Sequence, residues 1–155
     1  MLGFFSFTEV TDPSAHEAYN VWHQLDHMPE QYQLPGILHG SRWMADRECR
    51  QARIAGSGHL AEVGSVVNYL VTEPVQPTHD DFMQLGPRLA LMGRFPEHRP
   101  SLQLTMPALH RWYSSPRVQI SAEVVPFRPH RGVVVVVEEP VTSESVRMLN
   151  GIRMT

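Results

Sequence analysis

Two strand-like segments, residues 37–45 and 63–71, follow one amphipathic helix with no further helix between them. Residues 2–10, rich in Phe and β-branched side chains, precede that helix as another strand. A second helix from Thr78 and an alternating segment at 118–125 complete the order strand, helix, strand, strand, helix, strand. This order predicts an α+β, ferredoxin-like βαββαβ domain with an antiparallel sheet and both helices on one face.

The first helix is predicted to begin near residue 13, where two start signals compete: Asp12 before Pro13 offers an N-cap, and Ser14 with Glu17 offers a capping box. At about 100° per residue, its apolar side chains gather on one arc, expected to pack inward: Ala15, Ala18, Val21, Trp22, Leu25 and Met28. The opposite, polar arc holds His16, Tyr19, Asn20, His23, Asp26, His27 and Glu30. Pro29 is expected to kink or loosen the last turn, and Pro35-Gly36 must end the helix.

The rest of the first 126 residues has weaker signals. Residues 46–62 are charged and then glycine-rich, which predicts an exposed connection. Gly86-Pro87 should break the second helix into two short pieces. Residues 94–116 contain several prolines but also large apolar side chains, so we expect them to pack on the domain as a lid or short helix.

The C-terminal residues 127–155 resemble a second beginning. Gly132–Glu138 is predicted as an extra C-terminal strand, and Thr142 opens a short helix, in the same order as residues 2–25. Two interpretations remain open: a truncated second repeat after the domain 1–126, or an element that extends the sheet or is swapped to a partner.

Composition narrows the classes of partner and compartment. Both signs of charge are scattered along a chain of net charge -3, which disfavours nucleic acid as a partner. The longest apolar run, Val133 to Val137, is far too short to cross a bilayer, and the N-terminus lacks the basic region of a signal peptide. Cys49 is the single cysteine, so no intramolecular disulfide can form and a cytoplasmic location is expected.

A sheet covered by helices on one face leaves its other face open. Because a mostly apolar open face must be buried, we expect a homodimer that forms through this face.

Several short segments resemble the EthD-like branch of the dimeric α+β barrel superfamily. They are Leu2-Gly3-Phe4-Phe5, Tyr19-Asn20-Val21-Trp22-His23, Asp26-His27-Met28-Pro29-Glu30, Pro35-Gly36-Ile37 and Arg42-Trp43. The resemblance covers the first strand through the second, and residues 60–126 only by element order. It implies ferredoxin-like subunits whose sheets pair face to face, with a ligand cavity between sheet and helices in each subunit. It also implies a functional role for His27 and a structural one for Trp22, whereas segments 94–116 and 127–155 depart from the pattern.

His23, His27 and Glu30 are the candidate catalytic residues. His27 can act as a general acid or base, because imidazole titrates near neutrality and Glu30 or Asp26 can set its basicity. Alternatively it only caps the end of the helix. The same three residues, at helical spacing, are also an alternative ligand set for zinc or iron, although no H-E-x-x-H motif is present.

A second group of residues is predicted to bind substrate: Tyr19, Arg42, Trp43, Asn68 and Tyr69. Arg42 can hold a carboxylate or enolate with its planar paired donors. The structural alternative is that Arg42 pairs with Glu30 or Glu62, and that the tyrosines only pack.

The resemblance, together with these residues, implies a small-molecule enzyme without an organic cofactor. The expected chemistry is proton transfer, isomerisation or oxygenation of an aromatic, lactone or polyketide-like substrate, with His27 moving a proton while Arg42 or Tyr69 stabilises negative charge. The alternatives are a non-catalytic small-ligand-binding or stress-related module, or a metal-dependent protein. No P-loop, GxGxxG or GxSxG motif occurs, which disfavours nucleotide and serine-hydrolase chemistry.

Overall fold

An antiparallel sheet is the centre of the first part of the chain. The computed structural model describes residues 2–54, 58–95, 104–109, 117 and 119–136, and it divides into two units, Met1–Pro107 and Ala108–Thr155. In the first unit β3 (Ser65–Val71) pairs antiparallel with both β1 (Leu2–Thr8) and β2 (Ile37–Met44). All three strands lie within a few residues of their predicted positions.

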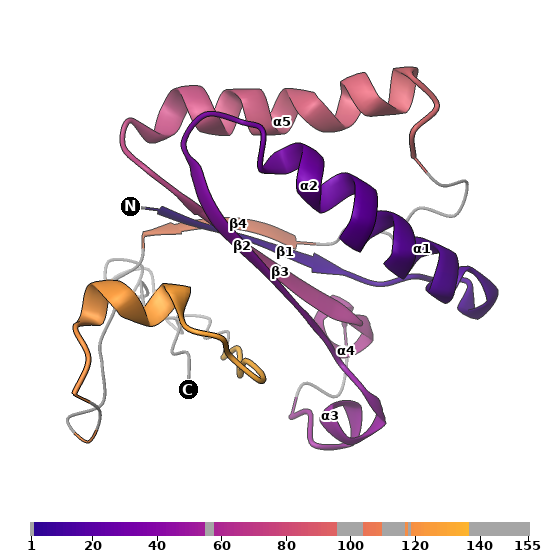
Figure 1. Ribbon diagram of the computed structural model, residues 1–155. Helices are drawn as coiled ribbons and strands as arrows, with labels where there is room; N and C mark the ends of the chain where they lie inside the picture. The colour runs from indigo at the N-terminus through magenta and orange to yellow at the C-terminus, as the bar shows by residue number, and fades with distance from the viewer. Residues whose placement is uncertain (1, 55–57, 96–103, 110–116, 118, 137–155) are drawn as a thin grey trace, which may run out of the picture. The chain divides into compact units, whose positions relative to one another are not determined.

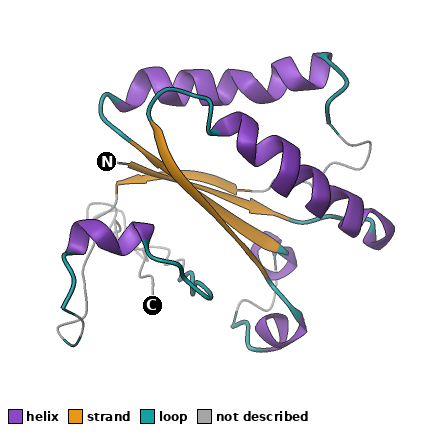
Figure 2. Ribbon diagram, viewed as in Figure 1, coloured by secondary structure: helices purple, strands orange, loops and turns teal. Residues whose placement is uncertain are grey.

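A fourth strand, β4 (Leu104–Leu109), extends the strand order to β2-β3-β1-β4 (Figure 2). The α+β class and the antiparallel sheet are thus confirmed, and this order is compatible with a ferredoxin-like fold. The last strand was predicted at 118–125. It lies instead at 104–109, within the segment 94–116 that was predicted to form a lid or short helix. Pro107 argued against a strand there, but proline is tolerated in an edge strand, and β4 stands at the edge of the order.

The first helix consists of four consecutive pieces. They are η1 (Pro13–Ala15), α1 (His16–Trp22), the π-helical turn η2 (His23–His27) and α2 (Met28–Gln31). Asp12 caps the start as predicted, because its carboxylate accepts from the backbone N–H of Ser14 at 2.9 Å. The π turn ends two residues before Pro29, whose ring would clash with a carbonyl of a regular α-turn. Pro29 thus loosens the helix, as expected.

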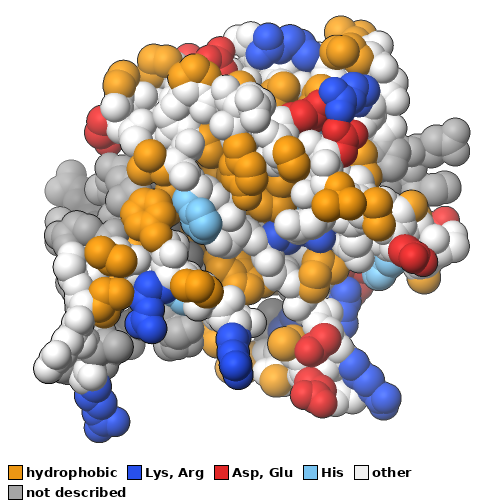
Figure 3. All heavy atoms as spheres, in the orientation of Figure 1, with side chains coloured by type: hydrophobic (Ala, Val, Ile, Leu, Met, Phe, Trp, Pro, Cys, Tyr) orange, Lys and Arg blue, Asp and Glu red, His pale blue; other side chains and the backbone are white. Residues whose placement is uncertain are grey.

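From α1 into the π turn, the buried side of this helix is the opposite of the predicted one, whereas Met28, after the π turn, is buried as predicted. Tyr19 and His23 are only 3% and 6% exposed, whereas Val21 and Leu25 are 54% and 73% exposed. Figure 3 shows hydrophobic side chains gathered on the surface over α1 and α2. The physical reason is the polar surface of the sheet beneath α1. Arg42 on β2 hydrogen-bonds to Asn20 and lies against the ring of Tyr19, so residues of the polar arc have partners on the buried side.

The second helix, α5 (Val75–Leu91), is continuous and starts before Thr78, contrary to the prediction. Pro77 stands in the first turn, where a missing N–H costs no helical hydrogen bond. Pro87 frees the carbonyl of Met83, a residue 51% exposed, so water can replace the missing donor. The helix therefore bridges Gly86-Pro87 without a break.

The core lies between the sheet and its helices. Figure 1 shows α1, α2 and α5 on the same side of β1, β2 and β3. Phe4 and Tyr69 face this side and contact Phe82 of α5, at ring-centroid distances of 4.5 and 5.3 Å. Met28 and Val67 complete the buried cluster. Because side chains alternate along a strand, Phe5, Phe7 and Leu70 face the other side of the sheet, where they are only 0%, 2% and 1% exposed. A further part of the core therefore lies on this face, and the expectation that the face is open is wrong at these residues.

The connections differ in part from expectation. Residues 46–62 contain two short exposed helices, α3 (Arg47–Gln51) and α4 (His59–Glu62). In the second unit, Ala122–Phe127 forms a 3-10 helix (η3), so the strand predicted at 118–125 is wrong; Leu104–Leu109 occupies the place beside β1. Residues 132–136 have no regular structure, and the remainder of the predicted C-terminal strand and helix lies outside the described residues.

Among the described residues, no helix is both long and apolar enough to cross a membrane.

Candidate functional site

Six of the eight predicted site residues come from the first helix or from the sheet face beneath it, although they do not form one site. These are Tyr19, His23, His27 and Glu30 from the first helix, and Arg42 and Tyr69 from the sheet. Trp43 follows Arg42 on β2, and Asn68 precedes Tyr69 on β3. Because side chains alternate along a strand, Trp43 and Asn68 point to the opposite face of the sheet. Asn68 is buried there, and its Nδ2 donates to the carbonyl oxygen of Phe4 at 3.4 Å. Neither Trp43 nor Asn68 shares a site with the histidines.

His23 and His27 lie in an aromatic group that we call the histidine cluster: Trp22, His23, His27 and Phe95. The rings of Trp22 and His27 stack at 4.7 Å with an interplanar angle of 12°. His23 meets His27 edge-on at 5.5 Å, and Phe95 lies 5.4 Å from His27. Rings surround both imidazoles, so the histidine face of the helix is not solvated.

Arg94 closes the outer side of the histidine cluster. Its guanidinium forms ion pairs with Asp26 and Glu30, and its carbonyl oxygen accepts from Trp22 Nε1 at 2.8 Å. Glu30 is therefore paired with Arg94, and its Oε2 stays 4.0 Å from His27 Nδ1. That distance is too long for the hydrogen bond through which a carboxylate would raise the basicity of an imidazole.

Burial keeps both histidines neutral at pH 7. It lowers the pKa of His23 to about 3, with the nearby charges of Arg42 and His27 acting in the same direction. Burial likewise lowers the pKa of His27 to about 4, against a smaller opposing effect of Asp26. Gln31 Nε2 donates to His27 Nε2 at 3.1 Å, so neutral His27 carries its proton on Nδ1. The buried Nδ1 atoms of His23 and His27 have no hydrogen-bond partner in the described part of the chain.

Arg42 is a partly buried cation without a counter-charge. Its Nη2 donates to Asn20 Oδ1 at 2.7 Å, and its Cζ lies 5.6 Å from the centre of the Tyr19 ring. Burial lowers the pKa of Arg42, and its buried Nε has no hydrogen-bond partner. No acidic side chain among the described residues pairs with it. The expectation that Glu30 or Glu62 neutralises Arg42 is therefore wrong.

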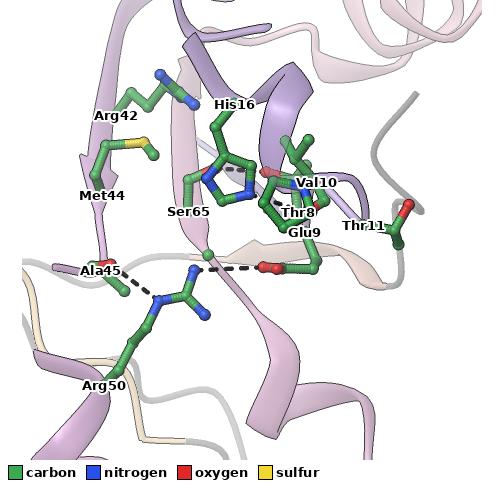
Figure 4. A pocket seen from close by; sticks show the side chains of 12 residues that line it. Thr8, Glu9, Val10, Thr11, His16, Arg42, Met44, Ala45, Arg50 and Ser65 are labelled. Carbon is green, nitrogen blue, oxygen red and sulfur yellow. Dashed lines mark hydrogen bonds and ion pairs between the residues drawn. The ribbon is translucent and has the colours of Figure 1, made fainter. Parts of the chain in front are cut away.

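Arg42 also lines a cavity of about 290 Å³ at the end of the sheet where β1 leads into the first helix. We call it the Arg42 cavity and define it by six lining residues: Thr8, Glu9, His16, Arg42, Arg50 and Ser65. Figure 4 shows Arg42 above the cavity, His16 beside it, and Arg50 reaching toward Glu9 at its other end. His23 and His27 do not line this space.

Hydroxyl groups form one wall of the Arg42 cavity. The Oγ atoms of Thr8 and Ser65, from paired positions on β1 and β3, are 2.5 Å apart. Tyr19 makes a side-chain hydrogen bond to Thr8, and burial raises the pKa of Tyr19, so its hydroxyl remains protonated at pH 7. The wall therefore presents neutral donors and acceptors next to the Arg42 guanidinium.

An ion pair forms the other end of the cavity. Arg50 Nη2 is 3.6 Å from Glu9 Oε2, and Arg50 Nε donates to the carbonyl oxygen of Ala45 at 3.2 Å. His16 Nε2 donates to the carbonyl oxygen of Val10 at 3.0 Å, which fixes its ring in the wall. Sequence reasoning missed these cavity residues, although one signal was present. Thr8 ends β1, Glu9 follows it and Ser65 begins β3, so antiparallel pairing brings them to the same end of the sheet.

The predicted alternative metal site does not form. His27 Nε2 is occupied by Gln31, and Glu30 by Arg94. Among the described residues, no group of three or more His, Cys, Asp or Glu side chains is placed to hold a metal ion. The triad His23, His27 and Glu30 is thus not arranged as a metal centre.

Comparisons with models of protein families, with curated proteins and with solved structures find no match to this chain.

Proposed function

We propose that this protein binds a small organic anion in the Arg42 cavity. The observation that supports this most strongly is the state of Arg42, a partly buried guanidinium with a buried, unpaired Nε and no acidic partner among the described residues. A cation held away from water without a counter-charge is costly, and a bound anion removes this cost. Guanidinium presents paired planar donors, which match a carboxylate or an enolate.

Titration of the protein with benzoate and with its neutral counterpart benzamide tests this proposal. Wild-type protein should bind benzoate and should discriminate against benzamide, and Arg42→Gln should lose most of the affinity for benzoate. Arg88→Gln, on the exposed side of α5, is the matched control and should bind as wild type does. Equal binding of both compounds, or unchanged binding by Arg42→Gln, contradicts the proposal.

We further propose, as a second function of the same region, cofactor-independent proton transfer on a bound aromatic, lactone or polyketide-like molecule. The supporting observation is that His23 and His27 are neutral at pH 7 and each has an unpartnered buried Nδ1. Neutral His23 can accept a proton, and Arg42 next to it can stabilise the negative charge that forms on the substrate. His27, whose Nε2 accepts from Gln31, can donate a hydrogen bond to the substrate through its protonated Nδ1. The Tyr69 hydroxyl, also buried without a partner, is a further candidate donor.

An activity survey against such compounds, with wild type and His27→Ala, tests the catalytic proposal. His130→Ala, in the second unit, is the control. Turnover should occur in wild type and in the control and should be lost in His27→Ala. Equal turnover in all three proteins contradicts it, and tight anion binding without any product indicates the alternative of a non-catalytic binding or stress-related module.

Membership of the EthD-like branch, a homodimer and a cytoplasmic location complete the proposal. The sheet face opposite the helices carries apolar side chains, of which Phe5, Phe7 and Leu70 are buried within one chain while Trp43 and Val66 are partly exposed. A second copy would contact this partly exposed portion near β2. Sedimentation equilibrium should give a dimer that Trp43→Asp weakens, and a monomer at every concentration would contradict this part.

A further inference from the structure

We infer that the ligand of the Arg42 cavity is a hydroxylated organic anion, whose anionic group pairs with Arg42 while its hydroxyl donates to Glu9. This inference rests on the proposed binding function and names the class of ligand. The cavity offers two different unsatisfied groups. Arg42 is a cation without an acidic partner, and Glu9 Oε2 is a buried acceptor that makes no hydrogen bond among the described residues.

The sheet register separates these two groups along the strands. Met44 and Thr8 both pair with Ser65, and Arg42 pairs with Val67, two residues along β3. One residue beyond Ser65, in the other direction, Gly64 N–H donates to the carbonyl oxygen of Thr8 at 2.7 Å, and Ala45 N–H donates to that of Gly64 at 2.8 Å. Glu9 therefore lies level with Gly64, whereas Arg42 lies opposite Val67. The three residues between these levels correspond to roughly 10 Å along the strand direction. Arg42 and Glu9 are also roughly 10 Å apart across the sheet, because β3 lies between β2 and β1. Both side chains line the cavity, so a ligand that contacts both must carry its two functional groups at opposite ends of a ring.

Charge at the Glu9 end favours a hydroxyl group over an ammonium group. Arg50 lies 3.6 Å from Glu9 and already balances the carboxylate charge. Arg50 cannot satisfy all the acceptor sites of that carboxylate, because each oxygen takes more than one hydrogen bond. A neutral hydroxyl donor fills the remaining site, whereas an ammonium group would meet the positive charges of both Arg50 and Arg42. The lining side chains therefore select a ligand that is negative overall.

Gly64 provides a way to disturb the Glu9 end without removing any charge. A Cβ atom at Gly64 would lie 2.6 Å from Glu9 Oε2 and 2.8 Å from Arg50 Nη2. Both atoms are ends of flexible side chains, so Gly64→Ala should fold while it displaces the Glu9–Arg50 pair. Gly132→Ala is the matched control, because a Cβ atom there meets nothing within 4 Å.

The test compares three probes that share one carboxylate: benzoate, 4-hydroxybenzoate and 4-(aminomethyl)benzoate. Affinities are measured by calorimetry or by chemical-shift titration of the full chain. Wild type and Gly132→Ala should bind 4-hydroxybenzoate about tenfold more tightly than benzoate, the effect of one hydrogen bond to a charged acceptor. In Gly64→Ala and in Glu9→Leu this preference should fall to less than about twofold, while benzoate still binds.

Each other outcome overturns a distinct statement. Equal affinity of wild type for benzoate and 4-hydroxybenzoate, with both lost in Arg42→Gln, overturns the hydroxyl inference and leaves the anion site standing. Tightest binding of the ammonium probe also overturns it, as does a preference that persists in both Gly64→Ala and Glu9→Leu. If no carboxylate binds, or if Arg42→Gln binds all three as wild type does, the proposed function itself fails. Circular dichroism on each variant identifies a failure to fold. If Glu9→Leu does not fold, the hydroxyl inference is tested with Gly64→Ala alone.

Discussion

The histidine cluster and the Arg42 cavity lie beneath the same helix but are opposite kinds of environment. In the histidine cluster, stacked rings hold two neutral imidazoles, and Arg94 pairs with the acidic residues outside. In the Arg42 cavity, a cation, an ion pair and two hydroxyl groups face a space of about 290 Å³. The comparison teaches that the two histidines with lowered pKa values and the residues that surround open volume are different sets, joined by Arg42 beside His23.

Acid should affect the histidine cluster more than any single substitution in the cavity. The pKa of His27 is about 4 and that of His23 about 3 in the folded protein, both below the ordinary value of 6.5, so between these values the unfolded chain binds more protons. Stability should therefore be constant above about pH 7 and should fall as the pH decreases toward 4, by on the order of 3 kcal/mol for His27 alone.

Urea unfolding at a series of pH values measures this loss. His27→Gln should show a shallower decrease than wild type, and His130→Gln should show the wild-type slope. A free energy of unfolding that does not change between pH 7 and pH 4 in wild type would contradict burial of the two imidazoles.

Replacement of Arg42 by an uncharged residue should stabilise the folded protein but abolish the binding of an anion in the cavity. Arg42→Met keeps much of the side-chain volume but removes a partly buried charge that has no acidic partner among the described residues. We expect the free energy of unfolding without ligand to rise by less than about 1 kcal/mol, because the charge is only partly buried and the lost hydrogen bond to Asn20 offsets part of the gain, while benzoate binding is lost. Thermal and urea unfolding measure the first effect. A destabilised Arg42→Met with an intact Arg42→Lys would instead indicate that Arg42 has a structural role.

Removal of one hydroxyl should have a smaller effect than the loss of anion binding. Tyr19→Phe deletes the group that hydrogen-bonds to Thr8 in the cavity wall but keeps the ring on His23 at 5.6 Å. A loss of about 1 kcal/mol in the free energy of unfolding is expected, with little change in the pH dependence set by the histidines. A change in the acid slope as large as that of His27→Gln would show that the two regions are not separate.

The smallest effect should come from the ion pairs outside the histidine cluster. Arg94 is 40% exposed in its side chain, and its partners Asp26 and Glu30 are 38% and 19% exposed. Arg94→Met should therefore lower the free energy of unfolding by less than about 1 kcal/mol, and by less still in high salt. A loss of several kcal/mol that is insensitive to salt would mean that Arg94 holds the cluster together, not the stacked rings.

The sheet was largely predictable from the sequence, and the helix faces were not. Alternation and turn residues placed β1, β2 and β3, and Asp12 placed the helix start. The buried face of α1 and the π turn was reversed because polarity alone assigns Tyr19 and His23 to the surface, whereas Met28 was correctly placed inside. Which face packs depends on the partner surface, and here Arg42 on β2 makes the sheet polar beneath α1.

The candidate site was predictable only in part, for two separate reasons. Side chains of consecutive strand residues point to opposite faces of a sheet. Trp43 could therefore not share a site with Arg42, nor Asn68 with Tyr69, and this was already evident from the sequence. The cavity residues Thr8, Glu9 and Ser65 carry no motif, and they meet only through the register of β1 and β3. That Arg42 has no acidic partner among the described residues could be seen only in the three-dimensional structure, because the sequence offered Glu30 and Glu62 as reasonable partners.

The most direct test of the central claim is a crystal structure of the protein grown with benzoate. The account predicts the carboxylate in the Arg42 cavity, with an oxygen within hydrogen-bond distance of the Arg42 guanidinium and the ring directed toward Glu9. Benzoate bound only elsewhere, or an Arg42 side chain that pairs with an acidic residue of the protein while the cavity holds only water, would contradict it.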